Sequence, residues 1–76
     1  MTSNYTLVDF HLNAMIQMLI RKHGYSYEDA LPVVMSSETY KSLLDKPYLQ
    51  EEGSLFIIEL LEKELEEQRA ETPAEA

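Results

Sequence analysis

Apolar residues recur at helical spacing along the first third of the chain, and they do so on two sides. One stripe consists of Val8, Leu12, Met15, Ile16 and Leu19, and the other of Leu7, Phe10, Ala14 and Met18. This spacing predicts a helix over residues 6–23. A surface helix needs only one apolar stripe. We therefore expect this helix to be either the central helix of the fold or part of a subunit contact.

The residues that follow indicate a turn and a second helix. Residues 21–23 place positive charge at the negative end of the helix dipole, and Gly24 suits the left-handed conformation that often ends a helix. Ser26 can cap the next helix, with acidic residues in its first turn. Pro32 would be the sixth residue of that helix, where it removes one backbone hydrogen bond. We expect either a kink at Pro32 or a short helix that ends near Ser36.

Two more helices are predicted in the second half of the chain. The first is short, with a cap at Ser37 and an end near Asp45, because a residue before proline disfavours the helical conformation. The stretch PYLQEEGS (47–54) is expected to be a loop or a brief extended piece. The last helix begins at Ser54, and its acidic end is expected to fray near residue 70. Its apolar positions are Phe56, Ile57, Ile58, Leu60, Leu61 and Leu65.

Length and composition are consistent with one small helical domain. The chain has 76 residues, of which 45% are hydrophobic, too many for a disordered chain. We predict the all-α class: a bundle of three main helices plus a short fourth, within a single domain over residues 1–70. Residues 71–76 are predicted to be a disordered acidic tail.

The negative charge is concentrated toward the C-terminus. Residues 1–50 hold five acids against four bases, whereas residues 51–76 hold nine acids against two bases, out of a net charge of −8. An acidic surface repels nucleic acid and attracts a basic partner. It also suits a solvated helix face that only keeps the protein soluble.

The sequence lacks the residues that several kinds of site would require. There is no cysteine, which excludes disulfides and thiol catalysis. His11 and His23 would lie about 18 Å apart along one helix and cannot share a metal ion. Neither a G-x-S-x-G elbow nor a glycine-rich phosphate loop is present. We therefore predict that the chain is not an enzyme and has no catalytic residue, metal site or cofactor, with little room for a pocket of about 300 Å³.

The chain also lacks an apolar run of the roughly 18 residues that a membrane span requires. Its first residues, MTSNYTLVDF, do not have the pattern of a secretory signal. We therefore expect no membrane association and a cytoplasmic location.

The order of signals around Gly24 resembles that of a helix-turn-helix motif. An alternative hypothesis is therefore that the chain is a small DNA-binding regulator. A recognition helix, however, needs cationic or amide side chains near its start. Here those positions hold Tyr27, Glu28 and Asp29. This composition argues against a nucleic-acid partner.

An apolar helix is followed by GYSYEDAL and then by SSETYKSLLDKPYLQEEGSLFIIELLEKEL. This order over residues 6–66, with Ser37, Thr39, Tyr40 and Leu43 in the pattern S-x-T-Y-x-x-L and the run ELLEKEL, resembles short uncharacterised bacterial helical proteins. Some of these are encoded beside toxin-like genes, including genes similar to those of ADP-ribosyltransferases. The resemblance implies a helical accessory protein with an antitoxin-like or immunity-like role, and it supplies no active site.

Together these features predict a non-enzymatic protein-interaction module that binds a protein partner or forms a homodimer. The apolar surface exceeds what one small core can hide, and tyrosine is common at interfaces, although tyrosines also cover small cores. The candidate contact residues are Leu7, Phe10, Ala14, Met18, Tyr40, Tyr48, Phe56 and Leu60.

Overall fold

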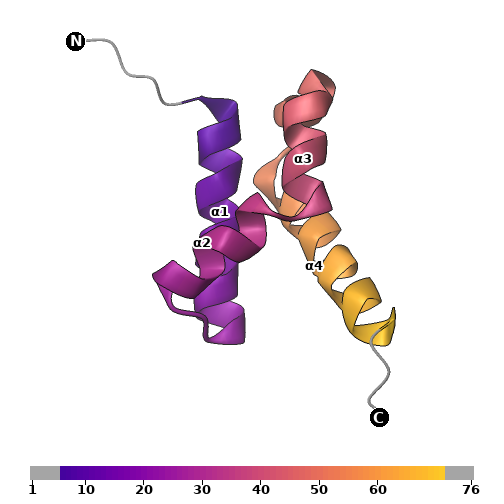
Figure 1. Cartoon of the computed structure of the whole chain (residues 1–76). Coiled ribbons are helices and arrows are strands. Elements are labelled where there is room, and N and C mark those ends of the chain that lie inside the picture. Colours follow the sequence, from indigo (N-terminus) through magenta and orange to yellow (C-terminus); the bar gives the residue numbers. More distant parts are fainter. Residues whose placement is uncertain (1–5, 72–76) are drawn as a thin grey trace, which may run out of the picture.

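The computed structural model describes residues 6–71, and every regular element in that range is helical. In chain order, the elements are α1 (Leu7–His23), α2 (Tyr27–Met35), α3 (Glu38–Asp45), the 3-10 helix η1 (Pro47–Glu51) and α4 (Ser54–Glu71) (Figure 1). The predicted all-α class is confirmed. The proportions differ from three main helices and one short one. Two helices are long, with 17 and 18 residues, and two are short, with nine and eight.

Residues 47–51 are not the loop or extended piece that we expected. They form η1, in which Leu49 N donates to Lys46 O at 2.9 Å and Glu52 N donates to Leu49 O at 3.1 Å. Pro47 opens this helix, where its missing N–H would have no helical partner. An element of five residues is too short to show a hydrophobic period, so sequence spacing does not reveal it.

The last helix extends past the boundary predicted at residue 70. α4 continues through Glu71, the first residue of the expected tail. The other residues of the predicted disordered tail, 72–76, lie outside the described residues, as do residues 1–5 of the predicted domain.

Side-chain caps define the starts of the first three helices. Thr6 and Asp9 form a reciprocal capping box on α1. Ser26 Oγ accepts from Asp29 N at 3.1 Å on α2, and Ser37 Oγ accepts from Tyr40 N at 3.1 Å on α3. These bonds satisfy backbone amides that have no partner within the helix. The predicted caps at Ser26 and Ser37 are confirmed.

Two further sequence signals mark the α1–α2 turn and the length of α2. Gly24 has φ 75°, the left-handed conformation expected at the end of α1. Pro32 lies inside α2, which nevertheless ends only at Met35. Of the two alternatives, the short helix ending near Ser36 agrees with the structure. The Ser36 hydroxyl donates to Pro32 O at 2.8 Å beside this end.

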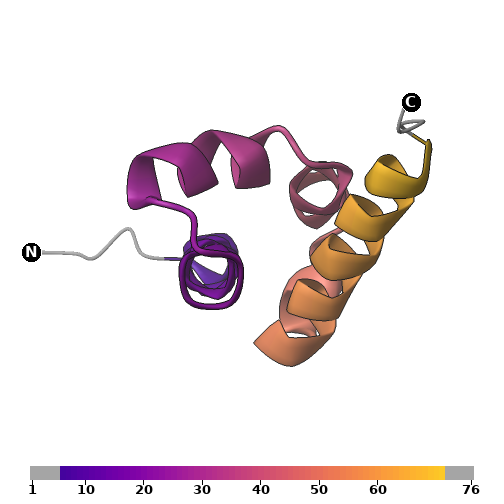
Figure 2. The same cartoon turned by 90° about the horizontal axis from the view of Figure 1, so that it is seen from below.

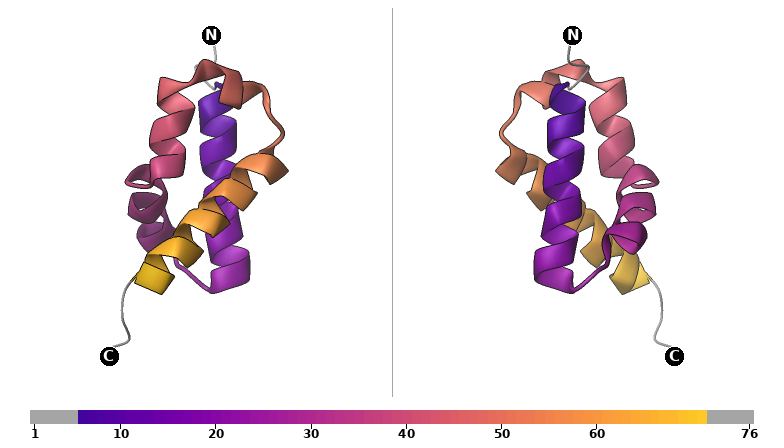
Figure 3. Two further views of the ribbon diagram at one scale, coloured as in Figure 1. Left: turned by 90° about the vertical axis from the view of Figure 1, so that its right-hand side faces the viewer. Right: turned by 90° about the vertical axis from the view of Figure 1, so that its left-hand side faces the viewer.

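The core is formed where α1 meets the other helices. α1 and α3 are both viewed end-on in Figure 2, and α4 crosses α1 obliquely in Figure 3. Because α1 contacts α2, α3, η1 and α4, it is the central helix, one of the two roles that its double stripe predicted. The buried apolar residues are Met15, Ile16, Leu19, Ala30, Val34, Leu43, Ile57 and Leu61.

Within residues 6–71, no helix has the length and apolar character needed to cross a membrane.

Candidate functional site

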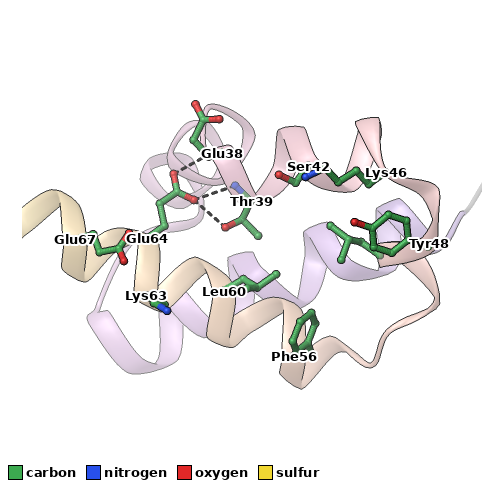
Figure 4. Close-up of a pocket in the computed structure, with 11 residues that line it drawn as sticks. Glu38, Thr39, Ser42, Lys46, Tyr48, Phe56, Leu60, Lys63, Glu64 and Glu67 are labelled. Carbon is green, nitrogen blue, oxygen red and sulfur yellow. Dashed lines mark hydrogen bonds between the residues drawn. The ribbon is translucent and has the colours of Figure 1, made fainter.

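A groove of about 560 Å³ lies between α3, η1 and α4 (Figure 4). Its size contradicts our expectation that so small a bundle has little room for a hollow above 300 Å³. The physical reason is the oblique course of α4. Its middle is joined to the start of α3 at Thr39 and Glu64, whereas its first turns diverge from the wall that carries Tyr48.

The α4 wall of the groove is a single stripe. Phe56, Leu60, Lys63 and Glu67 line it at spacings of four, three and four residues, and Glu64 lies four residues after Leu60. Such spacing places side chains on one face of a helix. From Phe56 to Glu67 the stripe extends about 17 Å at 1.5 Å per residue. The wall changes along its length from apolar to acidic.

The opposite wall comes from α3 and η1. α3 supplies Thr39 and Ser42, Lys46 follows at its end, and η1 supplies Tyr48 and Leu49. Tyr48 as a residue is 65% exposed, although it lies beside apolar neighbours. Figure 4 shows Tyr48 and Phe56 at the same end of the groove, away from Thr39 and Glu64. That end therefore presents two exposed aromatic rings.

Glu64 closes the other end of the groove by joining α4 to α3. Its carboxylate accepts from Glu38 N at 2.8 Å, Thr39 N at 2.9 Å and the Thr39 hydroxyl at 2.8 Å. We call these three bonds the Glu64 clamp. Ser37 satisfies the next amide of α3, that of Tyr40. A carboxylate at a helix start is also favoured by the helix dipole. The clamp therefore fixes the distance between the two walls at this end.

His11 supports the wide end of the groove from α1. The side chain is buried, and its two ring nitrogens contact two different segments: Nε2 lies 3.0 Å from Gln50 O and Nδ1 lies 3.0 Å from Ser54 Oγ. A backbone carbonyl only accepts, so Nε2 carries a proton and donates to it. We predicted that neither histidine binds a metal ion. The geometry gives His11 a structural role as the link from α1 to η1 and α4.

The elements that form the groove carry most of the negative charge. Residues 38–71 hold ten acids against four bases, a net charge of −6, whereas residues 1–37 hold three acids against two bases, a net charge of −1. Among the described residues, the two groove lysines, Lys46 and Lys63, form no ion pair. The lining of the groove itself holds three acids, Glu38, Glu64 and Glu67, against these two lysines, so most of the negative charge lies on the surrounding surface of α3, η1 and α4.

Three of the eight predicted contact residues come together in the groove. These are Tyr48, Phe56 and Leu60. Phe56 is 43% exposed, but Leu60 is half-buried and packs against the core, so Leu60 is less accessible to a partner than Phe56. Tyr40 is also half-buried against the core and lies outside the groove lining.

The other four predicted contacts lie on α1, apart from the groove. Leu7 and Phe10 are exposed, at 45% and 50%, and they form an apolar surface near the start of α1. Ala14 and Met18 are half-buried, and Met18 packs against the core. The second stripe of α1 therefore divides into an exposed start and a packed remainder.

Sequence reasoning did not identify the polar residues of the groove. Thr39, Ser42 and Glu64 have no local signal, because their roles depend on how α3 and α4 meet. Part of the α4 wall could have been found by extending the Phe56/Leu60 pair by one further helical step, which reaches Glu64.

A second charged cluster connects α1 to α4 on another face. Glu62 Oε2 lies 2.8 Å from Lys22 Nζ and 3.7 Å from His23 Nε2. The hydrogen bond from the Lys22 ammonium holds the pKa of Glu62 below its ordinary value of 4.5, although partial burial opposes this shift. Beyond the helix-dipole role that we expected, His23 thus contributes to an interhelix contact.

The described residues also bear on metal binding and on DNA binding. Among the described residues, no three His, Asp or Glu side chains are placed to hold a metal ion. Glu28 and Asp29 are exposed at the start of α2, where a DNA phosphate would be repelled.

Comparison of the chain with protein-family models, with curated proteins and with solved structures finds no match.

Proposed function

We propose that this chain is a non-enzymatic protein-interaction module and that the groove between α3, η1 and α4 is its binding surface. The observation that carries the proposal is the pair of exposed aromatic rings, Tyr48 and Phe56, at the open end of the groove. Aromatic side chains that are exposed beside a hollow are typical anchors of protein–protein contacts. An apolar surface in contact with water also costs free energy that a partner would recover.

The walls of the groove are held in place before any partner binds. The Glu64 clamp joins the walls at one end, and His11 anchors η1 and the start of α4 at the other. A surface that is already ordered loses less conformational entropy on binding. This rigidity supports a docking role over an incidental gap between helices.

An antitoxin-like or immunity-like role is the biological setting that we put forward. It rests on the resemblance to short helical accessory proteins given above. In that setting the groove would bind and restrain a toxin-like partner.

The test is affinity capture from the cells that produce the chain, with variants that remove the aromatic anchors. We expect Tyr48→Ala and Phe56→Ala to release the captured partner, with at least a tenfold loss of affinity for each, as for contact hot spots. Leu55→Ala is the matched control, because Leu55 is 76% exposed next to Phe56 but does not line the groove.

Two results would contradict the proposal. One is a partner whose binding survives both groove variants but is lost in Phe10→Ala, which would move the binding surface to the start of α1. The other is the absence of any partner that depends on Tyr48 or Phe56.

A further inference from the structure

We infer that the occupant of the groove is an amphipathic helix of a basic partner protein. This inference rests on the proposed function and specifies the chemistry of the partner. It depends on the shape of the groove, on the order of its apolar and charged residues, and on the charge of the elements that form it.

The shape fits a helix of about three turns. The α4 stripe from Phe56 to Glu67 extends about 17 Å, which is the length of eleven helical residues. α3 and α4 form the two walls, and an amphipathic helix commonly binds in an apolar groove between helices. The partner would place its apolar face on Tyr48, Phe56 and Leu60.

The order of residues along the groove sets the chemistry of each end of the partner. Apolar side chains line the open end, and Glu38 and Glu67 lie at the opposite end. Both oxygens of Glu64 accept bonds from α3. Glu67 therefore offers the more available carboxylate there, together with the exposed carboxylate of Glu38, which pairs with Lys41 at 3.5 Å. A lysine or arginine of the partner would face them, and the positive start of the partner helix would be favoured beside them.

The negative charge of the elements that form the groove also favours a basic partner over a second copy of this chain. Residues 38–71 carry a net charge of −6, and the whole chain carries −8. A second copy would bring like charge toward the groove. Its most basic segment, residues 21–23, already contributes Lys22 and His23 to the contact with Glu62. A basic helix gains attraction where a second copy meets repulsion.

The experiment uses three synthetic peptides and the full chain labelled with nitrogen-15. The first peptide is a three-turn amphipathic helix with leucine on one face and lysine elsewhere. The second replaces each lysine with glutamate. The third keeps the composition of the first but places leucine at alternate positions, which destroys the helical face. Backbone amide shifts of the labelled chain report where each peptide binds.

We expect the lysine peptide to shift amides of residues 42–46, 48, 49 and 56–60, and its affinity to fall at least about threefold from low to physiological salt. We expect Tyr48→Ala and Phe56→Ala to weaken this binding about tenfold each. The control Leu55→Ala should bind as the unchanged chain does. Circular dichroism would show that each variant keeps its helices.

The outcomes separate this inference from the proposed function. If the glutamate peptide binds the groove as tightly as the lysine peptide, or more tightly, the basic partner is wrong and the groove remains a binding surface. If the alternating lysine peptide binds equally well, the attraction is charge alone and the helical partner is wrong. If no peptide shifts the groove amides, both proposals are wrong.

Discussion

At the scale of single residues, the fold depends on polar side chains that each connect elements distant in sequence. His11 bonds to Gln50 and Ser54, which lie 39 and 43 residues away in the chain. Glu62 reaches back to Lys22 and His23 on α1. A chain of this size buries a small core, so each such contact is a large share of its stability.

We predict that His11→Ala lowers the free energy of unfolding by about 2–4 kcal/mol, because it opens a cavity and leaves the Gln50 carbonyl without its donor. Chemical denaturation followed by circular dichroism measures this loss. Asn13→Ala, at an exposed position on the same helix, should change stability little. Equal effects of the two substitutions would mean that the His11 contacts contribute nothing.

The Glu62 contact makes stability depend on pH in one direction. Because Lys22 lowers the folded-state pKa below 4.5, the folded chain favours the charged carboxylate. This stabilisation is complete well above pH 4.5 and is lost as the pH falls through the lowered pKa. The pair is partly exposed, so we expect a contribution of at most about 1 kcal/mol.

The measurement compares the chain with Glu62→Gln in denaturation curves from neutral pH to below pH 4. We expect the variant to be less stable at neutral pH and the difference to shrink as the solution becomes acidic. A difference that stays constant over this range would show that the Lys22 contact does not depend on the charge of Glu62.

At the scale of elements, the start of α3 depends on α4. Glu64 satisfies the amides of Glu38 and Thr39, which no residue of α3 can satisfy. α3 has only eight residues and would be marginal as an isolated helix. Its start should therefore become ordered only when α4 docks.

We predict that Glu64→Ala lowers the free energy of unfolding by about 2–3 kcal/mol, because it removes three charge-assisted bonds, two of them from the part-buried amide and hydroxyl of Thr39. Glu64→Gln should lose less, since its amide oxygen still accepts. Hydrogen exchange at the Glu38 and Thr39 amides should accelerate in both variants. Glu66→Gln, on the exposed face of α4, is the control, and an equal loss there would refute the clamp.

Local sequence signals predicted the elements well but not their contacts. The cap at Ser26, the cap at Ser37 and the glycine turn at Gly24 act within five residues, so sequence spacing reveals them. The hydrogen-bond partners of His11, and those of Glu64 on α3, lie 25 or more residues away and follow from packing. η1 was not predicted because an element of five residues is too short to show a hydrophobic period.

At the scale of the whole molecule, the two halves of the fold differ in net charge, and the groove lies in only one of them. The half made of α3, η1 and α4 is acidic and contains the groove, whereas the half made of α1 and α2 is nearly neutral. Sequence reasoning located the acidic end of the chain and three groove residues. The groove itself depends on the angle between α3 and α4, which local patterns do not specify.

We predict that the chain alone sediments as a monomer of 8.8 kDa at low salt, because two copies would bring their acidic halves together. Analytical ultracentrifugation over a range of concentrations measures this. A dimer that strengthens as salt is added and is lost in Phe56→Ala would instead assign the groove to a second copy. A dimer lost in Phe10→Ala would assign self-association to α1.

The buried ring of His11 also supplies a spectroscopic probe. Its Nε2–H group donates a hydrogen bond to Gln50 O and is buried away from water. This proton should therefore exchange with solvent slowly enough to give a separate low-field resonance in a proton NMR spectrum. Ordinary histidine ring protons exchange too fast to be seen. The signal would disappear when η1 separates from α1, even if every helix persisted. One proton would thus show whether the wall of the groove is assembled.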